Sequence, residues 1–252
     1  MERKGLASFL IGNILGVLAL AGFAATLLLV LPGYFLVFTL LPPSRAPHVA
    51  HRLISRNWAR LLFPLFFIRF KVNGKESIDP DKTYVFIANH RSQLDIPAYA
   101  LACSNTFRFL AKKELTKIPG LGWIIRKLYL TVDRKDHSER VKSMDAMRKS
   151  LEEGISVFVC PEGTRNTSER PLLPFKDGAF RLAIETQTPL AILTVKGSAD
   201  RLSPKHPLTL LPGPLVCEWS IPIETKGMTL SDLEILKETA RKTITENLTD
   251  FS

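Results

Sequence analysis

The chain has 252 residues, 46% hydrophobic and 23% charged, so it can bury one sizeable core, with or without an appended segment, and is not a disordered protein. A net charge of +10 indicates an anionic partner, which nucleic acid, a membrane surface or a phosphorylated substrate would satisfy. Cys103, Cys160 and Cys217 are far apart and odd in number, which argues against a disulfide framework or a zinc ribbon and favours small buried residues in a reducing compartment.

The N-terminal segment is the strongest indication of a membrane. No charged residue occurs from Gly5 to Ser44, an apolar run much longer than the roughly 7 to 15 residues of a removable signal peptide. One straight helix over this run would be about 60 Å long, about twice the thickness of the hydrocarbon layer. We therefore expect a break in the segment, either at Gly22 or at Pro32-Gly33.

Basic residues flank this segment, with Arg3 and Lys4 before it and Arg45 after it. Because Lys and Arg favour the cytoplasmic side, we expect a re-entrant hairpin with both ends there; a single span is the alternative, since a short basic N-terminus can be translocated. Residues 48–68 place apolar residues on one helical face and arginines opposite, which is typical of a helix at an anionic membrane interface. A helix packed on the domain with a solvated basic face is the alternative. Residues 1–70 are thus predicted to form a membrane hairpin and an interfacial helix.

Residues 71–252 alternate predicted strands and helices, the pattern of an α/β domain with a mainly parallel central sheet flanked by helices. The expected strands cover residues 84–88, 107–111, 128–132, 155–160 and 190–195, with weaker strands near 208–211 and 215–221. The expected helices cover about 93–102, 120–127, 138–153 and 177–187. A final helix is expected to begin at Ser231, because Glu234 three residues later completes a capping-box pattern.

Polar residues follow three of these strands directly. Asn89 and His90 follow the strand 84–88, Arg134 comes just after the strand 128–132, and the sequence PEGTRN follows the strand 155–160. In open α/β sheets, ligands bind beyond the carboxyl ends of the strands. The three polar segments are therefore expected to meet at one edge of the sheet and to form one site.

His90 and Asp95 are the candidate catalytic pair. A histidine can take a proton from an alcohol, and a carboxylate on its other nitrogen fixes the tautomer and stabilises the imidazolium. The nucleophile-elbow sequence Gly-x-Ser-x-Gly is absent, so the pair would activate a hydroxyl of the substrate itself. Arg134 and Arg165 offer guanidinium groups to a phosphate, and the backbone around Gly163 could add N–H donors.

Each pattern has a simpler explanation when taken alone. A histidine that caps the following helix would look like His90, and Glu-Gly-Thr-Arg is equally typical of a turn with a surface ion pair. Their joint occurrence after strands favours the functional interpretation. A metal site is disfavoured because His90 and Asp95 have no obvious third ligand. Nucleic-acid binding is disfavoured because the basic stretches adjoin the apolar segment and no recognised nucleic-acid module is present.

Four ordered blocks of the sequence resemble the glycerolipid acyltransferase family. They are NHRSQLD (residues 89–95), VDR (132–134), PEGTR (161–165) and TPLAILTVKG (188–197). The segments AKKELTKIPGLGW and PFKDGAF are also similar to family segments, and the likeness covers roughly residues 70–225. The chain departs from the family pattern where Thr131-Val132 precedes Asp133-Arg134, and in a fourth block that is poorer in proline.

The resemblance implies that His90 is the general base and Asp95 its orienting partner. It also implies a set of acceptor-binding residues, with two lysines as weaker candidates: Arg134, Glu162, Gly163, Thr164 and Arg165, then Lys112 or Lys113. The expected reaction is transfer of an acyl chain from acyl-CoA or acyl carrier protein to the sn-2 hydroxyl of 1-acylglycerol 3-phosphate (lysophosphatidic acid), giving phosphatidic acid. No metal or other cofactor is expected, and the catalytic domain would face the cytoplasm at the membrane.

Three alternatives stay open at this point. The acceptor could be another lysophospholipid or glycerol 3-phosphate. The same fold could serve a transacylase or a thioester hydrolase, in which another phospholipid or water replaces an expected partner. A non-catalytic membrane-bound lipid carrier is the third alternative, and the His-Asp pair disfavours it because a carrier needs no base.

Overall fold

The computed structural model describes residues 2–133 and 136–249 of the chain. Among these residues, a seven-stranded sheet forms the centre, in the order β1-β7-β6-β2-β5-β3-β4. The strands are β1 (Ile68–Asn73), β2 (Val85–Ala88), β3 (Phe107–Lys112), β4 (Leu130–Val132), β5 (Ser156–Val159), β6 (Leu190–Lys196) and β7 (Gly213–Trp219). Strands β2 to β6 are mutually parallel, and only the β6–β7 pairing is antiparallel. The predicted α/β fold with a mainly parallel sheet is confirmed.

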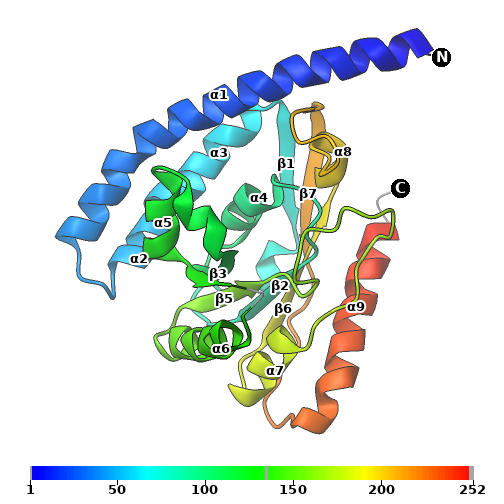
Figure 1. Cartoon of the computed structure of the whole chain (residues 1–252). Coiled ribbons are helices and arrows are strands. Elements are labelled where there is room, and N and C mark those ends of the chain that lie inside the picture. The colour runs from blue at the N-terminus through cyan, green and yellow to red at the C-terminus, as the bar shows by residue number, and fades with distance from the viewer. Residues whose placement is uncertain (1, 134–135, 250–252) are drawn as a thin grey trace.

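Helices cover both faces of this sheet (Figure 1). One face carries α3 (Arg56–Leu65), α4 (Asp95–Ala102) and α5 (Leu121–Leu128), and the other carries α6 (His137–Glu152), α7 (Gly178–Glu185) and α9 (Leu233–Thr249). Strand β2 shows why: Val85 and Ile87 pack in the core under α7 and α9, whereas Phe86 and Ala88 pack in the core under α3 and α4. Side chains alternate along a strand, so a strand with two covered faces is apolar throughout.

One expected strand is absent, and one strand was not expected. The segment near 208–211 is a loop with only an isolated bridge between Leu202 and Leu210, because Pro207 and Pro212 flank it and offer no N–H to a ladder. Residues 68–73 form the edge strand β1, which was not predicted, and the helix expected to reach residue 68 ends before Phe67 and its positive φ of 56°. The sheet therefore begins before the expected domain boundary at residue 70.

The C-terminal helix begins almost where expected, with different capping residues. A short 3-10 turn (Leu230–Asp232) precedes α9, and the capping box is formed by Thr229 and Asp232 rather than by Ser231 and Glu234. Three further short segments belong to the fold: α8 (Ser198–Arg201) after β6, and 3-10 turns at Lys75–Ser77 and Lys113–Lys117.

The N-terminal segment is one continuous helix, α1 (Glu2–Leu40), which curves over the side of the molecule that carries α3 and α5 (Figure 1). The expected breaks at Gly22 and Pro32-Gly33 are wrong. Pro32 removes only one helical hydrogen bond, whereas a turn within an apolar run would leave several backbone groups without partners. The chain turns at residues 41–45, which contain Pro42 and Pro43.

After this turn the chain runs back beside α1 through α2 (Ala46–Val49), a π-helical segment (Ala50–Ser55) and α3 (Figure 1). The helix expected over residues 48–68 thus lies between α1 and the domain. Trp58 stacks on Phe23 of α1 at 5.2 Å, while Leu62 and Phe63 enter the core. Several apolar side chains of this segment are exposed, among them Leu53 and Leu61. A helical hairpin is present, but its turn at residues 41–45 follows the apolar helix instead of lying within the apolar run, where the hairpin was expected.

The outer surface of α1 is apolar. Among the described residues, α1 is the one helix that is long and apolar enough to cross a membrane by length and composition, with a mean hydropathy of 2.7 over Phe9–Leu40. Its exposed side chains include Leu18, Leu29 and Leu40. Water does not favour such a surface on a monomer, and a lipid environment does.

The loop at residues 202–212 packs against the N-terminal half of α1. The Leu210 N–H donates to the Gly12 carbonyl at 2.9 Å. A Cβ on Gly16 would lie only 1.7 Å from the Leu208 carbonyl oxygen, so this close approach of two backbones requires glycine. The apolar helix α1 and the domain therefore share a tight contact near the chain's N-terminus.

Candidate active site

The expected site residues lie at the carboxyl edge of the parallel strands. Strand β2 lies between β5 and β6 and is parallel to both. The segments that follow these three strands therefore meet at one edge, where a parallel α/β sheet binds its ligands. His90 stands two residues beyond the end of β2, at the centre of this edge.

The structure brings His90 and Asp95 together. His90 Nδ1 lies 2.8 Å from Asp95 Oδ2, and the side chains are 15% and 0% exposed. Asp95 is the first residue of α4, and its Oδ2 also accepts the backbone N–H groups of Arg91 and Ser92, both at 2.7 Å. These bonds hold the carboxylate in place. With Nδ1 directed to a carboxylate, Nε2 is the ring nitrogen suited to accept a proton from a substrate hydroxyl.

Asn89 fastens the end of β2 to β6. Its amide nitrogen donates to the Val195 carbonyl at 2.9 Å, and its amide oxygen accepts the Val195 N–H at 2.8 Å. The Asn89 side chain thus makes the pair of hydrogen bonds that a backbone would make, just beyond the end of the β2–β6 pairing. The Asn89 carbonyl accepts a hydrogen bond from the Tyr99 hydroxyl of α4. The residue before His90 is consequently fixed through both its side chain and its backbone.

Glu162, after β5, makes contacts that differ from those expected. Its side chain is 2% exposed; Oε1 accepts the His90 N–H at 3.0 Å, and Oε2 accepts the Leu173 N–H at 2.8 Å. Burial raises the pKa of this carboxyl, and the bonds from the Leu173 and His90 N–H groups act in the opposite direction. Both oxygens are thus engaged with the protein backbone rather than directed to an acceptor.

The rest of the PEGTR sequence forms a turn beside His90. Gly163 has a φ of 70°, which favours glycine, and a Cβ there would lie 2.8 Å from Lys176 Cε. Thr164 is exposed and Arg165 is half-buried. The Asn166 N–H then donates to the His90 carbonyl at 2.8 Å. This bond ties the backbone directly after Arg165 to the backbone of His90.

The two lysines at the end of β3 are surface residues. Lys112 Nζ lies 3.2 Å from Glu114 Oε1, Lys113 Nζ lies 3.6 Å from Glu139 Oε2, and both lysine side chains are 55% exposed. Arg134, the remaining predicted ligand, lies outside the described residues. Among the residues that are described, no group of three or more His, Cys, Asp or Glu side chains is arranged to hold a metal ion.

Sequence reasoning did not identify several polar residues around His90. Arg91 donates from Nη2 to the Ser168 carbonyl at 3.0 Å, and Ser92 donates from Oγ to the Leu202 carbonyl at 2.8 Å. Both belong to the NHRSQLD block, so their place in that block was the available signal. No sequence signal identified Tyr99, because an aromatic residue in an apolar helix indicates only a core position.

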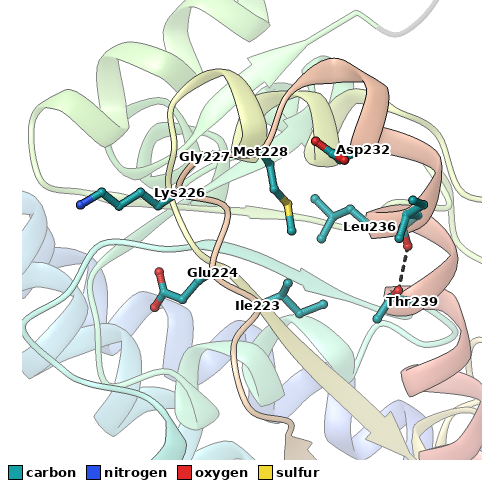
Figure 2. A pocket seen from close by; sticks show the side chains of 9 residues that line it. Ile223, Glu224, Lys226, Gly227, Met228, Asp232, Leu236 and Thr239 are labelled. Atoms are coloured by element: carbon teal, nitrogen blue, oxygen red, sulfur yellow. Dashed lines mark hydrogen bonds between the residues drawn. The ribbon is translucent and has the colours of Figure 1, made fainter.

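A shallow pocket on α9 is unrelated to this edge. It lies between residues 223–228 and the start of α9, as Figure 2 shows. Ile223 bridges to Leu190, the first residue of β6, which places the pocket at the opposite edge of the sheet from His90. Its polar groups serve the local backbone: Thr239 Oγ1 donates to the Ile235 carbonyl and Asp232 caps the helix (Figure 2). None of the predicted site residues lines it.

Comparisons with known proteins agree on one family. The family model described as Acyltransferase matches residues 69–196. An uncharacterized acyltransferase of Schizosaccharomyces pombe is 32% identical over 199 residues, 77% of this chain and 70% of that protein. The 1-acyl-sn-glycerol-3-phosphate acyltransferase of Saccharomyces cerevisiae is 30% identical over 211 residues, 81% of this chain and 68% of that protein. The crystal structure of the 1-acyl-sn-glycerophosphate (LPA) acyltransferase of Thermotoga maritima is similar with a TM-score of 0.79 and 26% identity, covering 97% of this chain and 98% of that chain.

Proposed function

The chain belongs to the acyltransferase family, and from that membership we propose that it transfers an acyl chain from a thioester to the sn-2 hydroxyl of 1-acylglycerol 3-phosphate, forming phosphatidic acid. The observation that carries the proposal is the His90–Asp95 pair, at 2.8 Å on the carboxyl edge of the sheet. The relatives named for this reaction in yeast and in Thermotoga maritima support the choice of acceptor.

The proposed chemistry needs one base and no acyl-enzyme. His90 Nε2 takes the proton of the acceptor hydroxyl while that oxygen attacks the thioester carbonyl carbon. The tetrahedral intermediate then expels the thiolate. The imidazolium gives this thiolate the proton that came from the acceptor hydroxyl, so the products are the ester and a free thiol. Asp95 holds the tautomer and stabilises the imidazolium between the two proton transfers.

We propose Arg165 and Arg134 as the cations that hold the acceptor's phosphate. Arg165 is half-buried beside His90, which suits a fixed fork for a phosphate close to the reacting hydroxyl. The turn at Gly163 and the exposed Thr164 hydroxyl could add donors. Lys112 and Lys113 are weaker candidates, since each already has a carboxylate partner on the surface.

The donor is proposed to be acyl-CoA or acyl carrier protein. Both are anionic, as is lysophosphatidic acid, and the chain carries a net charge of +10. The proton transfers assigned to His90, with Asp95 as its orienting partner, call for no metal or other cofactor, and we propose that the enzyme uses none.

The apolar surface of α1 indicates that the protein is membrane-associated. We propose that α1 and the returning helices lie along one leaflet on the cytoplasmic side instead of crossing the bilayer. Gly12 contacts the domain at Leu210, and Leu31 lies against Gly120. These two contacts are about 28 Å apart along α1 at 1.5 Å per residue, about the thickness of the hydrocarbon layer, so a spanning α1 would require parts of one domain on both sides.

Acyl transfer by purified protein tests the reaction. Detergent-purified protein is incubated with labelled acyl-CoA, or acyl carrier protein, plus lysophosphatidic acid, glycerol 3-phosphate or another lysophospholipid. Label in phosphatidic acid only with the first acceptor is the expected result. Preference for a different acceptor would move the proposal to that substrate, and thioester hydrolysis without transfer would defeat it. A carrier would bind lipid and release no thiol.

Cysteine labelling tests the membrane arrangement. Lys4→Cys and Ser44→Cys, each in a Cys160→Ser background, are treated in intact cells and in inverted membranes with an impermeant maleimide. Cys103 and Cys217 are buried and do not react. Both new cysteines should react only in inverted membranes. Labelling of position 4 from outside, with position 44 protected, would mean that α1 is a single span and would refute the arrangement along one leaflet.

A further inference from the structure

The peptide group between Asn89 and His90 is held at both of its ends by buried side chains. The ladder of β2 ends at Ala88, so the next peptide group has left the regular sheet. Its carbonyl, on Asn89, accepts the Tyr99 hydroxyl. Its N–H, on His90, donates to Glu162 Oε1 at 3.0 Å. One planar group is therefore held by two side chains from different elements, α4 and the loop after β5.

These two hydrogen bonds together fix the orientation of the Asn89–His90 peptide plane. A peptide group is planar, so restraining its C=O and its N–H together restrains rotation of the whole plane. The plane sets where the Cα of His90 lies and which way its side chain leaves the backbone. Asp95 then holds the ring at Nδ1. The position of Nε2 thus depends on the peptide as well as on Asp95.

Both side chains are buried in a way that suits this role. The Tyr99 ring stacks on Phe158 of β5 at 4.5 Å, and burial raises its pKa well above the usual value, so its hydroxyl remains a proton donor. Glu162 is a carboxylate with 2% exposure whose oxygens accept the His90 and Leu173 N–H groups. Burying a carboxylate is costly unless hydrogen bonds compensate it. The Glu162 carboxylate therefore depends on these two N–H groups, one of which belongs to the candidate base.

We propose that Tyr99 and Glu162 are positioning residues, which grip the Asn89–His90 peptide and so hold the His90 imidazole where proton transfer requires it. The inference rests on the proposed acyl transfer through His90. It gives Glu162 a role on the base, and not on the acceptor as its place in the PEGTR block first suggests. It also gives a role to Tyr99, which lies outside all four blocks.

Isosteric variants test the grip, with a matched control. Tyr99→Phe removes one hydroxyl, and Glu162→Gln removes one of two acceptors. Tyr84→Phe is the control, because Tyr84 is also buried and its hydroxyl also bonds to backbone, accepting the Asp79 N–H at 3.3 Å, before β2 begins. We expect kcat to fall about tenfold in each test variant with both KM values nearly unchanged, as a small misplacement of a catalytic group would cause. Tyr84→Phe should lower the Tm comparably and leave kcat within about twofold.

The double variant separates a shared grip from two independent effects. Once one end of the peptide is free, releasing the other should cost less, so the combined loss should be smaller than the product of the single losses. A full product would show that the two side chains act on separate features and would overturn the proposal. A raised KM for the acceptor with unchanged kcat in Glu162→Gln would return that residue to acceptor binding.

A measurement without substrate keeps this inference distinct from the proposed function. In protein with ¹⁵N-labelled histidine, the Nδ1–H signal of His90 is identified in detergent by its loss in His90→Ala. We expect its chemical shift to move in Tyr99→Phe and Glu162→Gln, because the hydrogen bond from Nδ1 to Asp95 loses its alignment. It should not move in Tyr84→Phe. Unchanged chemical shifts in Tyr99→Phe and Glu162→Gln would refute the grip, whereas a wild-type enzyme that does not acylate lysophosphatidic acid would refute only the function.

Discussion

The carboxyl ends of β2 and β3 present their polar side chains in opposite ways. Beyond β2, His90 and Asp95 are largely buried and tied to neighbouring backbone. Beyond β3, Lys112 and Lys113 are 55% exposed and paired with surface carboxylates. Strand β2 has β5 and β6 on its two sides, and both supply partners; β3 has the three-residue edge strand β4 on one side. A strand end can place a side chain, but hydrogen-bond partners from the neighbouring strands and the loops after them are needed to fix it.

The largest effect should come from removing the fixed base. His90→Ala should lower kcat by about 10²-fold or more, the usual share of a positioned general base, while leaving the fold intact. Asp95→Asn should cause a similar loss, because the amide can hold the wrong tautomer. Steady-state acyl transfer with circular dichroism as the folding control measures both. Near wild-type turnover by His90→Ala would remove the functional difference between the two strand ends.

A smaller effect should come from the half-buried arginine beside the base. Arg165→Ala should raise the KM for lysophosphatidic acid about tenfold, and the KM for the thioester much less, because it removes a charged partner of the phosphate. Arg165→Lys is the matched control, since it keeps the charge without the fork and should recover part of the loss. If only donor affinity weakens, Arg165 faces the phosphates of the donor instead.

The smallest effect should come from the exposed lysines. Lys112→Ala and Lys113→Ala should each change kcat/KM by about twofold or less, since exposed ion pairs contribute only about 0 to 1 kcal/mol. Raising the salt concentration should erase even that difference, because solvated charges are screened. A loss above about tenfold for either lysine would show that the end of β3 closes over the substrate, and the contrast with β2 would fail.

The sequence predicts the fold well where local pattern and tertiary structure agree. The apolar run before Asn89 predicts a strand covered on both faces, and β2 is such a strand. The prediction was wrong where the effect of a residue depends on its surroundings. Gly22 and Pro32 predict a break in α1, but the apolar surroundings favour an unbroken helix. Strand β1 was missed because its sequence continues the apolar and basic alternation of the helix before it.

The candidate site shows the same limit. His90 and Asp95 are five residues apart, so one turn of chain predicts their contact. The bond between His90 and Glu162 joins residues 72 positions apart, and no local spacing encodes it. The role of Tyr99 is still harder to predict. Its aromatic ring fits the apolar pattern of the helix, and that pattern does not indicate where its hydroxyl donates. Motif reading found the groups that would react, and packing was required to find those that hold them.

The close approach of Gly16 to Leu208 has a practical consequence for anyone wanting a water-soluble enzyme. A fragment that begins after residue 45 discards the apolar helix, and with it the surface on which residues 202–212 rest. Leu202, at the start of that loop, accepts the Ser92 hydroxyl, and Ser92 donates its N–H to Asp95. Truncation for solubility would therefore loosen a loop that is two hydrogen bonds away from Asp95, the candidate catalytic carboxylate. Replacing exposed residues such as Leu18 and Leu29 by polar ones, with α1 kept, is the route that spares the loop.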